Sequence, residues 1–119
     1  MIILSAFSGT LASAGGWTPL GERVVGERTV EESIAVASGG SYKQIKLQVK
    51  VNPLKIGTVK VTFKDGTSFD TTLDGYVMPP GFTKVIELPE AKSIGKVTFT
   101  YKRVGSGAYA PVVRLHGSI

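Results

Sequence analysis

The chain contains few residue types that catalyse reactions, and their spacing assembles no recognisable active site. There are no cysteines, so a disulfide framework, a thiolate metal site and a cysteine nucleophile are excluded. The single histidine, His116, lacks the second histidine and nearby carboxylate of a zinc site, and we expect it on the surface or on an edge strand. No nucleophile with its base stands out either. We predict that the protein is not an enzyme and that it uses no cofactor or metal.

Three aspartates bracket one predicted hairpin at positions 65, 70 and 74. A calcium loop supplies oxygen ligands at alternate positions of a compact run, whereas these aspartates are spread on both sides of a strand. We interpret them as turn-forming and solvated residues. The Ser-Gly-Gly-Ser segment at 38–41 lacks the lysine and the helix of a phosphate-binding loop, so it is expected to be a plain loop.

Basic and aromatic side chains are better candidates for binding. The net charge of +5 favours polyanions, but the lysines are scattered, without the dense block of a nucleic-acid-binding arm. If two lysine-bearing strands are neighbours, they form a basic ribbon for an acidic glycan; otherwise the lysines only protect the sheet. Trp17 and Tyr101 are expected in the core or at its edge. The possible ligand surface comprises Lys46, Lys50, Lys60, Lys96, Lys102, Tyr76 and Tyr109.

These residues are positioned by a series of predicted strands. A chain of 119 residues fits one domain, and its fifteen glycines and six prolines indicate many turns and short elements. Apolar and polar residues alternate with a period of two in the run Lys43–Val51, as they do in a half-buried strand. Similar runs occur throughout, so we expect strands at 20–25, 33–36, 43–51, 58–63, 69–73, 84–88, 96–102 and 112–116.

The spacing of these segments predicts an all-β fold, an antiparallel two-layer β-sandwich of about eight strands that is jelly-roll-like. Asp65-Gly66 between two alternating runs predicts a tight hairpin, and Pro89 is expected to end the sixth strand. Ile86 and Leu88 should point inward. The predicted core also includes Ile45, Leu47, Val49, Val61, Phe63, Val97, Phe99 and Tyr101.

Five segments of the chain carry a family resemblance: WTPLGERVV at 17–25, IKLQVK at 45–50, VTFKDG at 61–66, TKVIELP at 83–89 and VTFTYK at 97–102. Together they resemble a group of small exported bacterial β-sandwich proteins of unknown function. Members share a W-x-x-L-G-x-R opening and a V-x-F-x-Y strand. The resemblance implies export and a β-sandwich, and it implies no activity.

Residues 1–14 form an apolar segment ahead of the domain at 15–119. As a signal peptide they would end in Ala12-Ser13-Ala14, with cleavage before Gly15, but no basic residue precedes Arg23. As a retained arm they would bury Ile3, Phe7 and Leu11, at least partly against another subunit. Both alternatives stay open from the residues alone. No run is long and apolar enough for a transmembrane helix.

The principal hypothesis is a non-enzymatic, exported structural protein that self-assembles through this arm into a homo-oligomer, in one form a filament. The alternative is a monomeric exported module that binds a glycan or another polyanion through the lysine surface. Either protein would work in the periplasm, at the cell surface or outside the cell. No specific nucleic acid is expected as a partner.

Overall fold

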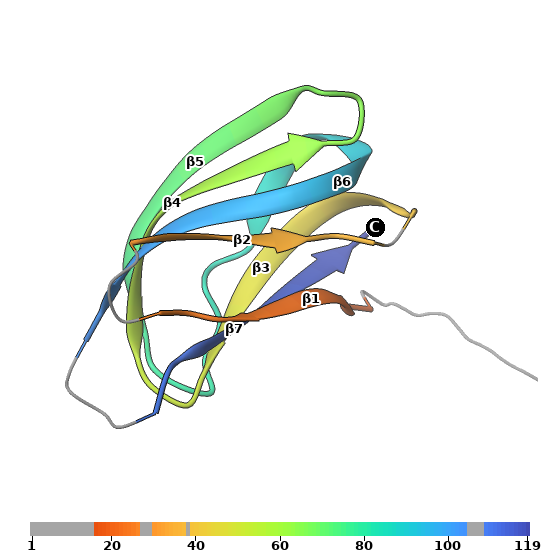
Figure 1. The fold of residues 1–119 in the computed structure, drawn as a ribbon. Coiled ribbons are helices and arrows are strands. Elements are labelled where there is room, and N and C mark those ends of the chain that lie inside the picture. Colours follow the sequence, from red (N-terminus) through yellow and green to blue (C-terminus); the bar gives the residue numbers. More distant parts are fainter. Residues whose placement is uncertain (1–15, 27–29, 38, 105–108) are drawn as a thin grey trace, which may run out of the picture.

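The structure is a computed structural model, and it describes residues 16–26, 30–37, 39–104 and 109–119. These residues form seven strands and no helix (Figure 1). Every strand pairing is antiparallel. The strands are β1 (Thr18–Val24), β2 (Glu31–Ala35), β3 (Ser41–Lys50), β4 (Leu54–Phe63), β5 (Ser68–Val77), β6 (Ile86–Arg103) and β7 (Val112–Ser118).

The strands form two layers that share β6. The first layer has the order β1-β7-β3 and is completed by the beginning of β6, where Ile86 pairs with Ile45. The second layer contains β2, the remainder of β6, β4 and β5, in that order. There Ile94 of β6 pairs with Phe63. The prediction of an all-β antiparallel sandwich is therefore confirmed, with β6 passing from one layer to the other (Figure 1).

The expected stop at Pro89 is wrong, because the segments 84–88 and 96–102 belong to the single strand β6. This is why the structure has seven strands rather than eight. Glu87 pairs with Gln44 and Lys92 pairs with Tyr42, so several residues of β6 lie opposite one residue of β3. Proline lacks the N–H group that a regular ladder requires, but it is tolerated in such a bulge. Pro89 therefore sits where β6 changes layers without interrupting the strand.

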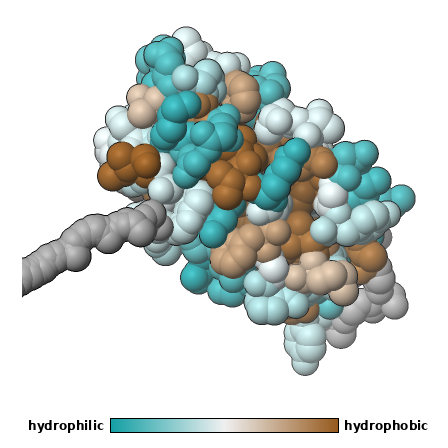
Figure 2. Space-filling model, turned by 180° about the vertical axis from the view of Figure 1, so that it is seen from behind, coloured by the Kyte–Doolittle hydropathy of each residue, from teal (hydrophilic) through white to brown (hydrophobic). Residues whose placement is uncertain are grey.

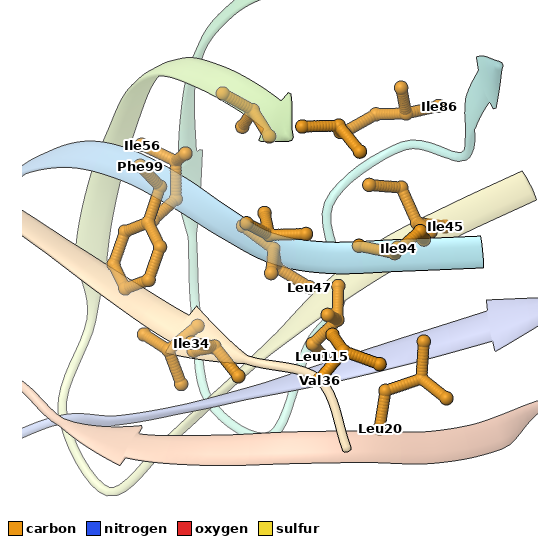
Figure 3. Packing of buried hydrophobic residues seen from close by; sticks show 14 of the residues in the cluster. Leu20, Ile34, Val36, Ile45, Leu47, Ile56, Ile86, Ile94, Phe99 and Leu115 are labelled. Carbon is orange, nitrogen blue, oxygen red and sulfur yellow. The ribbon is translucent and has the colours of Figure 1, made fainter. Parts of the chain in front are cut away.

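The core lies between the two layers. Leu20, Leu47 and Leu115 of the first layer point toward Ile34, Ile56 and Phe99 of the second (Figure 3). Burying each such side chain contributes roughly 1.5–3 kcal/mol. All ten residues that the alternation pattern placed inside, including Ile86 and Leu88, are at most 5% exposed. Phe69 and Leu73 of β5 pack against this core while remaining partly exposed.

The hairpin between β4 and β5 turns at Asp65-Gly66, as predicted. Gly66 has a φ of 91°, a conformation that glycine adopts without steric cost. The Asp65 carboxylate accepts hydrogen bonds from the N–H and the hydroxyl of Thr67, at 2.9 and 2.5 Å. These bonds, together with Lys92, lower the pKa of Asp65 to about 2. Asp65 is thus a turn residue.

The Leu20-Gly21 part of the opening motif has a packing role. Leu20 is in the core, and Gly21 lies so close to β2 that an added Cβ would be 2.5 Å from Ile34 Cγ2 and 3.1 Å from the Ala35 carbonyl oxygen. The backbones of β1 and β2 therefore approach each other across the two layers only because position 21 has no side chain.

We expect Gly21→Ala to lower the free energy of unfolding by about 1–3 kcal/mol, the usual effect of overpacking. Gly39→Ala is the matched control, because a Cβ at position 39 meets no atom within 4 Å. Urea unfolding followed by circular dichroism measures both variants. Equal stability of the two variants would contradict the packing role of Gly21.

Candidate functional site

A cluster of aromatic, basic and amide side chains lies on the outer face of the first layer, around Lys46. Its neighbours Ile45 and Leu47 are fully buried, so the period-two geometry of β3 directs Lys46 outward. The Lys46 ammonium lies 4.2 Å from the centroid of the Trp17 ring and 4.2 Å from that of Phe82. It is therefore held between two rings that come from distant parts of the chain.

Phe82 reaches this face because its segment is attached to the free edge of β3. The Thr83 N–H donates to the Leu47 carbonyl oxygen at 2.8 Å, and the Val49 N–H donates to the Gly81 carbonyl oxygen at 2.9 Å. The Thr83 hydroxyl accepts a bond from the Leu47 N–H at 3.1 Å. Phe82 itself lies opposite Gln48 in a short bridge. The connection between β5 and β6 thus extends the first layer by a few residues.

His116 is the third ring of the cluster, and its expected position on the surface or an edge strand is wrong. Strand β7 is paired with β1 on one side and β3 on the other, and His116 is only 9% exposed. Its ring meets Phe82 edge to face, with the centroids 5.6 Å apart. Its Nε2 lies 3.1 Å from Gln48 Oε1. Because an amide oxygen only accepts, this bond requires the tautomer in which the imidazole donates from Nε2, and the amide NH₂ group takes no part in it.

Burial lowers the pKa of His116 below its ordinary value of 6.5, and the positive charges of Lys46, Arg114 and Lys50 lower it further. The imidazole is therefore neutral at pH 7. A neutral ring that donates from Nε2 is compatible with the bond to Gln48 and with close packing against Phe82.

The charges around the cluster are unevenly compensated. Glu22 binds Arg114 at 2.8 Å and Lys50 at 3.5 Å, and the hydrogen bond from Arg114 is the main reason why the pKa of Glu22 is lowered. Lys46 forms no ion pair with any carboxylate in the described part of the chain. The face therefore presents one fixed cation whose charge is uncompensated.

A groove of about 190 Å³ begins beside Phe82 and continues the cluster toward the end of β5. Several large apolar side chains are exposed here: Tyr76 near the end of β5, and Met78, Phe82 and Val85 in the connection to β6. Figure 2 shows hydrophobic surface lying among hydrophilic side chains on one face of the molecule. The groove is lined by Leu73, Gly75, Tyr76, Val77, Phe82, Thr83 and Lys84.

The five lysines of the predicted ligand surface do not form one ribbon. Lys46 and Lys50 alternate with buried residues of β3, whereas Lys60 belongs to β4, and Lys96 and Lys102 to the second part of β6. They divide between the outer faces of the two layers. Lys60, Lys96 and Lys102 lie on the neighbouring strands β4 and β6 of the second layer, so the condition for a ribbon is met by these three lysines, whereas Lys46 and Lys50 lie apart from them on β3 of the first layer.

The predicted burial of the aromatic residues is correct for some of them and wrong for Trp17. Tyr101 is buried and donates its hydroxyl to the Gly26 carbonyl oxygen at 3.0 Å. Tyr76 and Tyr109 are exposed, as predicted. Trp17 differs, because it lies half-buried against Lys46 on the outer face and is absent from the core cluster. Whether Tyr76 and Tyr109 contact a ligand stays a prediction.

Three members of the cluster were missed by the sequence analysis: Gln48, Phe82 and the buried His116. Gln48 belongs to the same alternating run as Lys46, so its outward direction could have been read from the pattern. Phe82 follows Pro79-Pro80-Gly81, and nothing in a loop sequence says that it will bind the edge of β3.

Within the described residues, no group of histidine, aspartate and glutamate side chains is arranged to hold a metal ion. The same part of the chain has no helix with the length and apolarity needed to cross a membrane. The predicted assembly residues Ile3, Phe7 and Leu11 lie outside the described residues.

Comparison of the chain with protein families gives one match, which spans residues 1–117. The chain belongs to the family described as a domain of unknown function, DUF2541. The expected membership of a family without an assigned activity is thereby confirmed, although the motifs expected of that family are not. No curated protein sequence matches the chain.

Among solved structures, a mutant of the family 29 carbohydrate-binding module CBM29-2 is similar at 13% identity, covering 87% of this chain and 85% of that chain, with a TM-score of 0.45. A second family 29 carbohydrate-binding module, also a mutant, is 15% identical over 92% of this chain and 84% of that chain, with a TM-score of 0.42. The enzymatically active domain of bacteriophage CBA120 tailspike protein 4 is 12% identical over 87% of this chain and 19% of that chain, with a TM-score of 0.34. All three scores are below 0.5, and we attach no functional meaning to them.

The lowered pKa of His116 predicts a specific loss of stability in mild acid. Just below pH 6.5 the unfolded chain binds a proton at this ring while the folded protein does not, so stability falls as the pH decreases through this window. We expect His116→Gln to lose less stability than the wild type between pH 7.5 and pH 5. Urea unfolding of both proteins at both pH values measures this difference. The two proteins have the same carboxylates, so the effect of carboxylate protonation on the free energy of unfolding cancels in the comparison. Equal losses would contradict a buried, neutral His116.

Proposed function

We propose that the protein is a non-enzymatic binding module for an acidic glycan, and that the cluster of Trp17, Lys46, Gln48, Phe82 and His116 forms its binding site. The observation that carries the proposal is the position of Lys46. Its ammonium is fixed between two aromatic rings and has no carboxylate partner among the described residues. A fixed and uncompensated cation favours a ligand that brings a negative charge.

The residue types around Lys46 match the chemistry of such a ligand. Aromatic rings supply large, rigid contact surfaces at little cost in conformational entropy, and the apolar C–H faces of sugar rings pack against them. The two ring centroids lie at most about 8.4 Å apart, because each lies 4.2 Å from the same nitrogen. The ammonium would bind a carboxylate or sulfate group, and the Gln48 amide would donate to a sugar hydroxyl.

The groove beside Phe82 indicates the path that a bound glycan chain would follow away from Lys46. It leads from Phe82 to Tyr76, whose side chain is 67% exposed. A glycan chain that engages Lys46 would therefore continue along Thr83 and Lys84 toward Tyr76. Lys84 adds a second positive charge to this path, which favours an acidic chain over a neutral one.

The cluster is suited to binding rather than to reaction. The Nε2 atom of His116 is occupied by Gln48. Two described carboxylates of this face are also engaged: Glu22 by Arg114 and Lys50, and Glu87 by the Gln44 amide. General acid–base catalysis needs a group that can reach the substrate and exchange a proton. No pair of described residues on this face meets that need.

Export stays part of the proposal, because a module for acidic glycans would meet its ligand at the cell surface or outside the cell. Self-assembly through Ile3, Phe7 and Leu11 stays a separate prediction. No contact among the described residues favours it over the binding module.

We predict that Lys46→Gln weakens binding of an acidic oligosaccharide, such as oligogalacturonate, about tenfold or more, since a hydrogen bond to a charged group contributes about 1.5–3 kcal/mol. Lys96→Gln removes the same charge from the other layer and is the control, which should bind like the wild type. Isothermal titration calorimetry measures both variants, in low and in moderate salt. Binding should weaken with added salt, because screening reduces attraction between exposed charges.

Two results would contradict the proposal. One is an equal loss of affinity in the Lys46→Gln and Lys96→Gln proteins, which would indicate attraction to net charge alone. The other is the absence of binding to a panel of carboxylated and sulfated oligosaccharides by folded wild-type protein.

A further inference from the structure

The second layer contains a pair of lysines that the sequence analysis did not connect. Lys55 of β4 and Lys102 of β6 are direct partners across the antiparallel ladder. Side chains at such positions lie close together, and like charges directly opposite one another destabilise the pairing. Asp74 lies 3.3 Å from Lys55, whereas Lys102 has no ion pair or hydrogen bond within the described part of the chain. Of the two lysines, Lys55 therefore has a carboxylate partner and Lys102 has none among the described residues.

The backbone is irregular at this same place on both sides of β4. The register between β4 and β6 shifts between Ile56 and Val59, and the register between β4 and β5 shifts between Ile56 and Thr58. Asp74, on the adjacent strand β5, has a positive φ of 47°. Bulges redirect side chains and are common next to functional sites. Irregular backbone therefore surrounds the Lys55–Lys102 pair.

A hollow of about 270 Å³ lies over this irregularity, and both lysines line it. Gly57 keeps it open, because an added Cβ would be 2.7 Å from Thr100 Oγ1. The Thr100 hydroxyl oxygen accepts a hydrogen bond from the Thr58 N–H at 2.8 Å and lies 3.0 Å from the Thr58 hydroxyl. The hollow is thus lined by two lysines, a threonine hydroxyl and the Asp74 carboxylate, together with Val30, Gly57 and Tyr101.

We propose that the hollow between Lys55 and Lys102 is a second anion-binding site, which takes one carboxylate or sulfate group. The anion would lie between the two ammonium groups and relieve the repulsion between them. Its partners would be charge-assisted hydrogen bonds from both lysines and a bond from a threonine hydroxyl. In the unbound protein, the Asp74 carboxylate is the anionic partner of Lys55, but it forms no ion pair with Lys102.

Asp74 is the competitor of the anion. Its side chain is 68% exposed, and an exposed ion pair contributes little to stability, so an arriving anion can displace it. Removing the Asp74 charge therefore strengthens anion binding, while removing either lysine charge weakens it. A general effect of net charge would give the same signs, but it would also weaken binding when a lysine away from the hollow, such as Lys60, is neutralised.

This site is distinct from the cluster around Lys46, although Tyr76 stands between them. The Lys55 ammonium lies 5.4 Å from the centroid of the Tyr76 ring, and the same tyrosine lines the groove that begins at Phe82. An acidic glycan that follows the groove would reach Lys55 past Tyr76. The second site does not depend on binding at Lys46, and a free anion tests it separately.

The experiment is a titration of the full ¹⁵N-labelled chain with sodium sulfate, compared with sodium chloride at equal ionic strength and followed by NMR. We expect sulfate-specific, saturable shifts of the Gly57, Thr100 and Lys102 amides. Lys102→Gln should weaken the apparent affinity at least threefold, and Asp74→Asn should strengthen it at least twofold. Lys60→Gln, which removes a charge from the same face away from the hollow, should leave it unchanged. A parallel titration with oligogalacturonate separates a glycan carboxylate from a free inorganic anion.

The inference is overturned if these amides respond equally to sulfate and chloride, or if Lys60→Gln and Lys102→Gln weaken binding to the same extent. Lys46→Gln distinguishes the two proposals. Retention of the sulfate response in Lys46→Gln supports a separate site, and its loss would show that the anion binds at the first cluster instead.

Discussion

Both layers of the molecule depend on one strand, because β6 is hydrogen-bonded to β3 at its beginning and to β2 and β4 along the rest of its length. Its alternation must keep Leu88, Ile94 and Phe99 inside while the strand passes from one layer to the other. The bulge around Pro89 makes this change of layer possible. The strand therefore fixes the position of each layer relative to the core, and with it the direction of every outward side chain.

The two proposed sites follow from this arrangement. Close packing uses all inward positions for aliphatic and aromatic side chains, so chemistry is confined to the outer faces and to the connections. On the first layer, the segment 81–83 attaches to β3 and brings Phe82 to Lys46 and His116. On the second, irregular pairing around Gly57 leaves a hollow between two lysines. In each place one lysine, Lys46 on the first layer and Lys102 on the second, forms no ion pair with a described carboxylate.

The fold was largely predictable because period-two alternation reports burial directly. Ile45, Leu47 and Val49 are inside for the reason that the pattern gave, and Asp65-Gly66 turns as its residue types require. The union of two predicted strands into β6 was not predictable, since a proline ends most strands and only the bulge opposite Lys43 accommodates it. The burial of His116 also depended on tertiary structure, because a local pattern does not say which strand is central.

Of the cluster around Lys46, only the lysine itself was predictable from the sequence. Lys46 was identified as an outward lysine, but its aromatic neighbours Trp17 and Phe82 come from positions 29 residues before it and 36 residues after it. Contacts of this kind are set by strand order, which alternation does not determine. The pairing of Lys55 with Lys102 was hidden for the same reason, since it requires the register between β4 and β6.

Fluorescence of Trp17 gives the most direct test of the Lys46 cluster as the glycan site. Trp17 is the only tryptophan in the chain, and it lies against Lys46, so its emission reports on this cluster alone. The decisive measurement is a titration of the wild-type protein with an acidic oligosaccharide and with its neutral counterpart. The account predicts a saturable change in emission with the acidic ligand and a much weaker response to the neutral one. Binding of the acidic ligand, detected by calorimetry, without any change in Trp17 emission would contradict it.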